Sequence, residues 1–206
     1  RMAVAHDKYD FFWLVNDDTH LYPWCLEELL LADKFSVKIF KKRGIYLGSV
    51  KDPETGMFSY GGKKIDKKGD RIKRVIPDKI HYQQCDVGNG NIMMVSNEVY
   101  NEFGEFCDYY THGIADYDYT LQASRAGFPV LAAPDYLGEC TNDHGPNWVP
   151  QTSAIKERIT YLYSPKGLAY KEYLHYIKKY FPKKYYSAKI KLWLKTLFPV
   201  FWSCFK

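Results

Sequence analysis

Two aspartates end the apolar stretch Phe11-Phe12-Trp13-Leu14-Val15-Asn16-Asp17-Asp18. A short apolar run that ends in polar residues predicts a buried strand over residues 10–16. Two neighbouring carboxylates raise each other's pKa unless a cation neutralises them. Aspartate oxygens suit Mg²⁺ or Mn²⁺, which often bridge to phosphate oxygens. Because ligands gather at the carboxyl ends of strands in open α/β sheets, the stretch predicts a metal–nucleotide site.

Helix and strand signals alternate from this stretch to about residue 141. The expected elements are helices after Pro23 and at 96–103 and 116–126, strands at 45–50, 84–87, 92–95 and 128–133, and a hairpin around 52–62. Residues 63–74 are rich in lysine and predict a solvated loop. The alternation predicts an α/β fold with a mixed or parallel sheet flanked by helices.

The pattern becomes helical from about residue 155, with breaks at Pro165, Pro182 and Pro199. We therefore expect an α/β domain over residues 1–150 and a basic, aromatic helical extension over residues 151–206.

Charge is unevenly distributed along the chain, whose net charge is +5. Residues 171–206 contain nine lysines and a single acidic residue, Glu172, whereas the preceding residues hold 20 basic and 23 acidic side chains. A nucleic-acid-binding protein usually spreads basic side chains over its folded face. The mildly acidic body therefore argues against nucleic acid as a partner.

The sequence also limits the compartment and the class of site. Its five cysteines are widely spaced and contain no CxxC pair, which argues against zinc and favours reduced thiols in a cytoplasmic protein. No signal-peptide pattern and no apolar run of 18 residues is present in the sequence.

Two further segments offer groups for catalysis or ligand binding. Asp116 and Asp118 fall in the first turn of a predicted helix, where the helix dipole alone would favour them. Since residues two apart do not share a helix face, only one should enter a cleft, where it could act as a general base. The Gly88-Asn89-Gly90-Asn91 segment permits close approach of the backbone to a ligand, or is a plain tight turn.

Alternatives remain for the aspartate pair and for a histidine. Asp17 and Asp18 are typical of a turn after a strand. If they bind a ligand, neighbours on an extended chain point in opposite directions, so we expect Asp18 to hold the metal and Asp17 to bond a ribose or sugar hydroxyl. His144 lies in a loop rich in turn residues, where it is a further metal ligand, a diphosphate contact or an exposed side chain.

Taken together and in order, these segments resemble the inverting family-2 glycosyltransferases with the GT-A fold. The matching stretches are Trp13-Leu14-Val15-Asn16-Asp17-Asp18-Thr19 through Leu30, Asp52-Pro53-Glu54-Thr55-Gly56 through Gly62, Gly88-Asn89-Gly90-Asn91 through Gly104, and Gly113-Ile114-Ala115-Asp116-Tyr117-Asp118 through Gly127. The resemblance covers roughly residues 5–145. The N-terminal portion that cradles the nucleotide base in this family has no counterpart in the sequence.

The resemblance implies a role for each matching residue. Asp18 would coordinate Mn²⁺ or Mg²⁺ on a nucleotide-diphosphate sugar, with Asp17 near the ribose or the donor sugar. Asn16 stands where the family often has a further aspartate, and Ala115 where glutamate commonly precedes the base. Asp116 matches the base that deprotonates a glycan or lipid-linked acceptor. The last matching group, which would line the donor and acceptor sites, is Gly88, Asn89, Gly90 and Asn91.

A second hypothesis places the protein in a different functional class. The chain would then be a truncated or degenerate module that binds a glycan or a partner chain without turnover, and EDTA would not affect that binding.

The C-terminal segment 183–206 allows two interpretations. Its apolar residues at helical spacing are Ile190, Trp193, Leu194, Leu197 and Phe201, and lysines surround them. Such a helix can lie in a membrane interface, here the inner face of the cell membrane. Alternatively, it docks on the rest of the protein with its lysines in water.

Overall fold

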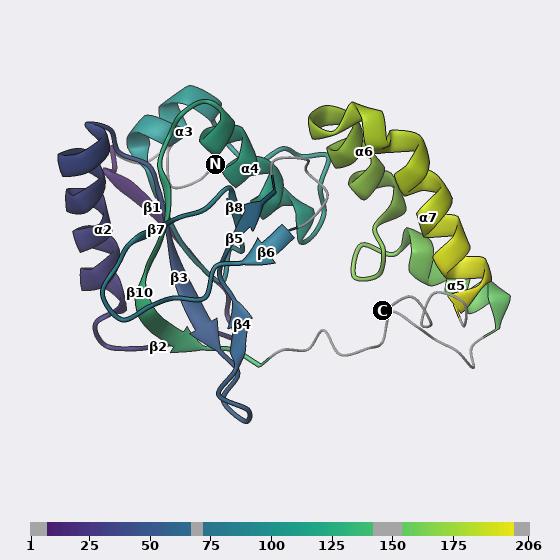
Figure 1. The fold of residues 1–206 in the computed structure, drawn as a ribbon, viewed down its shortest axis with the longest axis horizontal. Helices are drawn as coiled ribbons and strands as arrows, with labels where there is room; N and C mark the ends of the chain where they lie inside the picture. Colours follow the sequence, from purple (N-terminus) through teal and green to yellow (C-terminus); the bar gives the residue numbers. More distant parts are fainter. Residues whose placement is uncertain (1–7, 67–71, 142–153, 200–206) are drawn as a thin grey trace. The chain divides into compact units, whose positions relative to one another are not determined.

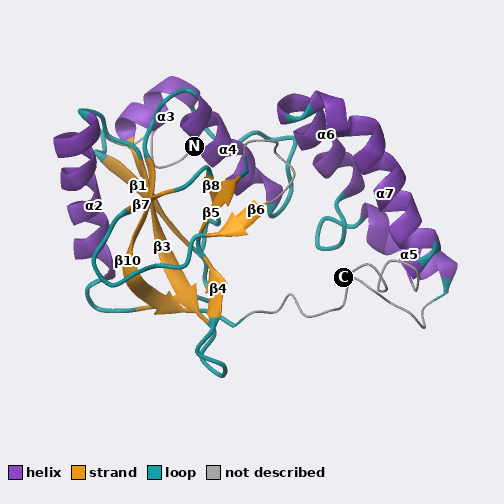
Figure 2. Ribbon diagram, viewed as in Figure 1, coloured by secondary structure: helices purple, strands orange, loops and turns teal. Residues whose placement is uncertain are grey.

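The structure is a computed structural model that describes residues 8–66, 72–141 and 154–199. The chain divides into two compact units (Figures 1 and 2). The first comprises Arg1–Cys107 and Asp116–Asn142 and contains the strands. The second comprises Asp108–Ala115 and Asp143–Lys206 and contains the C-terminal helices.

A seven-stranded mixed sheet forms the centre of the first unit. Its path runs β1-β9-β3-β10-β2, and β4 and β7 pair with β3 and β10. The strands are β1 (Phe11–Val15), β2 (His20–Leu21), β3 (Ile45–Lys51), β4 (Phe58–Tyr60), β7 (Gln83–Gln84), β9 (Ile92–Ser96) and β10 (Val130–Glu139). The α/β class expected from the sequence is therefore confirmed, with a mixed sheet.

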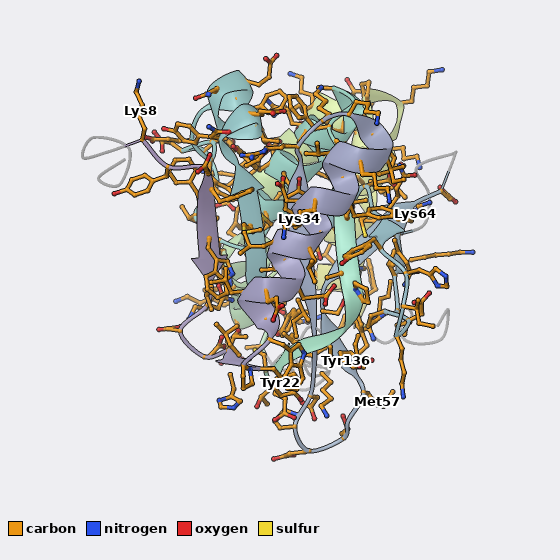
Figure 3. The ribbon with its side chains drawn as sticks, turned by 90° about the vertical axis from the view of Figure 1, so that its left-hand side faces the viewer. Lys8, Tyr22, Lys34, Met57, Lys64 and Tyr136 are labelled. Carbon is orange, nitrogen blue, oxygen red and sulfur yellow. The ribbon has the colours of Figure 1, made fainter. Side chains whose placement is uncertain are left out.

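Helices cover both faces of this sheet because its strands present apolar side chains to each side. On one face, α2 (Cys25–Phe40) buries Leu29 and Ala32 against Tyr46 and Val50 of β3. Figure 3 shows α2 lying across this face with Lys34 on its outer side. On the other face, residues of α3 (Asn97–Phe103) and α4 (Ile114–Arg125) pack against β3 and β9.

Strand β1 is less buried than its apolar sequence predicts. Trp13 and Val15 are 37% and 39% exposed. Among the described residues β1 pairs only with β9, so it is the last strand on its side of the sheet. Phe11, Phe12 and Leu14 still pack against the two core clusters. The sequence of β1 is therefore apolar because side chains on both faces of the strand contribute to the core. One edge of the strand is nevertheless exposed.

The expectation of a loop over residues 63–74 was wrong in part. A three-stranded sheet with order β6-β5-β8 forms from β5 (Gly62–Ile65), β6 (Ile72–Arg74) and β8 (Val87–Gly88). Ile65 pairs with Ile72, and Lys63 pairs with both Arg74 and Val87. Backbone pairing to β8 thus overrides the polar composition of the segment.

Local signals correctly located several helix ends. The Ser96 side chain accepts a hydrogen bond from the Val99 amide at the start of α3, which Gly104 ends with a φ of 69°. Gly127, with a φ of 79°, follows α4. A left-handed backbone conformation favours glycine, so both stops follow from the sequence.

A buried polar network ties α2 to the sheet. The Tyr46 hydroxyl donates to Asp33 Oδ1 at 2.6 Å and accepts from the Gly44 amide at 2.8 Å. Arg43 Nε lies 3.6 Å from Asp33 Oδ2. Burial, together with the Asp33 carboxylate, raises the pKa of Tyr46 above its usual value. The hydroxyl therefore remains protonated and satisfies two buried groups at once.

Replacing Tyr46 with phenylalanine should destabilise the protein by about 1–3 kcal/mol, because Asp33 and the Gly44 amide each lose a buried partner. Urea unfolding followed by circular dichroism measures this change. The control Tyr9→Phe, at an exposed tyrosine, should change stability by less than about 0.5 kcal/mol. Equal stability of Tyr46→Phe and the wild type would show that the network contributes nothing.

The second unit is helical within its described residues. It contains α5 (Ile155–Tyr163), α6 (Tyr170–Tyr180), the 3₁₀ turn η2 (Pro182–Lys184) and α7 (Tyr185–Leu197). The segment 108–115 joins it through Thr111, whose hydroxyl donates to Glu172 Oε1 at 2.6 Å, and through Tyr109, which stacks on His175. No helix in the described part of the chain is long and apolar enough to cross a membrane.

Candidate functional site

Three strands of the central sheet end at the same edge. Strands β1 and β3 are both antiparallel to β9, and β10 is parallel to β3, so β1, β3 and β10 run in one direction. Strand β9 begins at this edge, where Val15 pairs with Ile92 and the Asn16 amide donates to the Asn91 carbonyl at 3.2 Å. The edge therefore brings the aspartate pair next to the Gly88–Asn91 segment.

Asp17 and Asp18 occupy a tight turn. The Thr19 amide donates to the Asn16 carbonyl at 3.1 Å, which makes the two aspartates the central residues of a β-turn. Both are exposed. The assumption that they lie on an extended chain was wrong, because the strand ends at Val15. Both carboxylates are accessible at the edge of the sheet.

Cys140, which the sequence indicated only as a reduced thiol, connects the Gly88–Asn91 segment to the end of β10. Its sulfur accepts a hydrogen bond from Asn91 Nδ2 at 3.5 Å. Burial raises the pKa of the Cys140 thiol; the Thr19 hydroxyl opposes this shift and the Asp18 carboxylate adds to it. A neutral thiol therefore lies beside Asp18. Cys140 directly follows β10, and this position at the carboxyl end of a strand is the sequence signal that could have identified it as a residue of the site.

Helix α4 lies against the Gly88–Asn91 segment through two hydrogen bonds. The Gly88 amide donates to Thr120 Oγ1 at 3.1 Å, and the Gly90 amide donates to Asp116 Oδ2 at 2.8 Å. Four residues of helix advance about 6.0 Å, and two residues of extended chain about 6.6 Å. The distance from Asp116 to Thr120 along α4 therefore matches the distance from Gly90 to Gly88 along the segment. Each acceptor side chain can then reach its glycine amide.

The surroundings of both glycines leave little room for a side chain. A Cβ atom at Gly90 would lie 3.1 Å from both carboxylate oxygens of Asp116, and one at Gly88 would overlap the Leu47 side chain. The Asn89 side-chain oxygen, between them, is buried and accepts no hydrogen bond from any described residue. A buried acceptor of this kind can accept a hydrogen bond from water or from a ligand.

Asp116 and Asp118 have different environments. Asp116 is half-buried and contacts Gly90, whereas Asp118 is buried within the first unit. Asp116 is therefore the residue of this pair that contacts the Gly88–Asn91 segment.

A second polar cluster at the carboxyl ends of β3 and β10 was not anticipated from the sequence. The Tyr22 hydroxyl donates to Glu139 Oε1 at 2.6 Å, and Lys51 Nζ lies 3.5 Å from the same oxygen. Tyr22 follows β2, at the lower end of α2 in the view of Figure 3. The cluster places one cation and one anion at the edge that also holds Asp17 and Asp18.

Histidines do not join the aspartate turn in the described residues. His144 lies outside the part of the chain that the structure describes. His20 is exposed and pairs with Glu139 through the backbone of β2 and β10. His112 belongs to the second unit. No role of a histidine as a metal ligand follows from the described structure.

The carboxylates at the edge of the sheet suit a metal ion that takes some of its ligands from a substrate, rather than one held by protein ligands alone. Within residues 8–66, 72–141 and 154–199, no three His, Cys, Asp or Glu side chains gather to hold a metal ion. Mg²⁺ sites commonly use one or two carboxylates and take further ligands from substrate phosphates and water. The exposed carboxylates of Asp17 and Asp18 fit that arrangement.

In comparisons with known proteins, neither a family model nor a curated protein sequence matches the chain.

Stability should depend on pH through Glu139. The hydrogen bond from Tyr22 lowers the pKa of Glu139 below its ordinary value of 4.5, assisted by Lys51. Its contribution to stability is therefore complete above pH 4.5 and is lost as the pH falls through the folded-state value. In thermal melts, Glu139→Gln should be less stable than the wild type at pH 7, and the difference should shrink below pH 4.5.

The exposed Glu102→Gln substitution on α3 is the matched control, because Glu102 takes no part in the Tyr22 cluster. A stability difference for Glu139→Gln that is the same at pH 7 and pH 4 would contradict the assignment.

Proposed function

We propose that this chain is a metal-dependent inverting glycosyltransferase with a GT-A type of fold. It would transfer a sugar from a nucleotide-diphosphate donor to a hydroxyl of a glycan or lipid-linked acceptor. The main support is the convergence of three distant segments, since the Asp17–Asp18 turn, the Gly88–Asn91 segment and Asp116 meet at one edge of the sheet.

The donor would bind at the aspartate turn. Asp18, with an oxygen of Asn16 or Asp17 beside it, would hold Mn²⁺ or Mg²⁺ against the donor diphosphate. The metal ion would supply Lewis-acid stabilisation of the departing diphosphate. The buried Asn89 oxygen supports the proposal, because it can accept a hydrogen bond from a sugar hydroxyl.

Asp116 would act as the general base. Its Oδ2 atom accepts a hydrogen bond from the Gly90 amide, which holds the carboxylate beside the Gly88–Asn91 segment at the start of α4. The acceptor O–H proton would pass to Asp116 as the acceptor oxygen bonds to the anomeric carbon. The bond from that carbon to the diphosphate breaks, and its electron pair leaves with the diphosphate. A single displacement inverts the anomeric centre.

The alternative is a module that binds a glycan or a partner chain without turnover. Such a module would need no metal, and its binding would be indifferent to EDTA.

Asp18→Ala should abolish Mn²⁺-dependent nucleotide binding, since the carboxylate between metal and protein is lost. The measurement is a thermal-shift panel of UDP, GDP and dTDP, each with Mn²⁺ or with EDTA. A ligand at about 100 times its dissociation constant stabilises the protein by about 2.7 kcal/mol, which is readily observed.

The neighbouring substitution Asp17→Ala is the matched control, and it should weaken binding while preserving the dependence on Mn²⁺. Wild-type shifts that persist in EDTA would favour the non-catalytic module.

Asp116→Asn should leave nucleotide binding intact and lower transfer by about 10²- to 10⁴-fold, the usual contribution of a general base. Release of nucleoside diphosphate from UDP-, GDP- and dTDP-hexoses, with octyl glycosides as acceptors, measures the rate. Glu102→Gln serves as the surface control. Transfer at the wild-type rate in Asp116→Asn would contradict its role as the base.

A further inference from the structure

Helix α7 is docked within the second unit by one face only. Ala188, Leu192 and Thr196 are buried on this face, and α7 packs against α5 and α6. Arg158 of α5 donates to the carbonyl oxygens of Thr196 and Leu197 at 3.0 and 3.2 Å, which satisfies the end of the helix. This face of α7 therefore agrees with the second interpretation of the C-terminal segment, in which the helix docks on the rest of the protein.

The opposite face of α7 is apolar and exposed. It consists of Tyr186, Ile190, Leu194 and Leu197, which are 75%, 59%, 44% and 38% exposed and which we call the α7 stripe. Their spacings of four, four and three residues keep them on one side of a helix. A helix that needed only its docked face would have polar residues here.

Lysines border the α7 stripe on both sides. Lys189 and Lys191 precede and follow Ile190, so each is turned about 100° from it in opposite directions. Lys183 adds a further exposed charge at the start of the helix. Asp and Glu are absent from the sequence after Glu172. The exposed side of α7 is thus an apolar strip with cationic borders.

Two residues of the face expected from the sequence are not part of the stripe. Trp193 is half-buried, and its Nε1 donates to the Tyr170 hydroxyl at 3.2 Å. Phe201 lies outside the described residues. The exposed face is therefore rotated from the expected one, with Tyr186 in place of Trp193.

We propose that the α7 stripe and its lysines bind the surface of an anionic lipid bilayer, with the helix parallel to the membrane plane. The stripe supplies apolar side chains for the acyl boundary, and the bordering lysines can extend to anionic headgroups while their stems remain apolar. A cationic border without acidic residues complements an anionic bilayer. The inference stands independently of sugar transfer, because it uses none of the residues at the sheet edge.

The test is flotation of the full chain with vesicles of phosphatidylcholine containing about 30% phosphatidylglycerol, and with phosphatidylcholine alone. The wild type should float with the anionic vesicles only. Ile190→Ser/Leu194→Ser should reduce partitioning at least tenfold, because two apolar side chains no longer enter the bilayer. The matched control is Ile76→Ser/Ile80→Ser, which changes two exposed isoleucines of the first unit and should float like the wild type.

A separate variant tests how much the lysine charges contribute to membrane binding. Lys183→Gln/Lys189→Gln/Lys191→Gln should weaken binding by about fivefold for each lysine, and raised salt should do the same. Circular dichroism establishes that each variant is folded. Equal flotation of the wild type and Ile190→Ser/Leu194→Ser would overturn the proposal. It would also be overturned if sedimentation showed that the stripe forms a dimer and the wild type bound no vesicles.

Discussion

Two glycine amides hold α4 against the segment that leads from β8 into β9 of the central sheet, and the arrangement of the candidate site depends on them. Gly88 and Gly90 donate to Thr120 and Asp116, one helical turn apart. A Cβ atom at Gly90 would crowd the Asp116 carboxylate, and one at Gly88 would overlap the Leu47 side chain. Core packing of Tyr119 and Ala123 holds α4 on the sheet, and these hydrogen bonds add the contact that joins Asp116 to the Gly88–Asn91 segment, although 98 residues separate Asp116 from Asp18 in the chain.

The remaining contacts extend this arrangement across the edge of the sheet. The Asn91 carbonyl accepts from Asn16, and its side chain donates to Cys140. One residue at the start of β9 therefore connects the ends of β1 and β10. Since β1, β3 and β10 share a direction, their carboxyl ends form one rim, where a ligand could contact several segments at once.

Sequence reasoning succeeded where a local rule decides the structure. Ser96 and Gly104 mark the ends of α3, and the residue types at the aspartate turn and the Gly88–Asn91 segment indicated the positions that the sheet brings together. It failed where pairing partners decide, as in β5 and β6, whose lysine-rich sequence predicts a loop. The role of Cys140 and the Tyr22–Glu139 contact follow only from the register of β10 with β2 and β3.

The central claim is that the aspartate turn and the Gly88–Asn91 segment form one metal-dependent nucleotide site. Paramagnetic broadening of amide NMR signals by Mn²⁺ in the presence of a nucleoside diphosphate tests it directly, because broadening falls steeply with distance from the ion. The account predicts that the amides of Thr19, Gly90 and Asn91 broaden first, that those of Lys41 and Lys42, which precede β3 at the opposite end of the strands, broaden least, and that Asp18→Ala removes the effect. Broadening that is unchanged in Asp18→Ala, or confined to other parts of the chain, would contradict it.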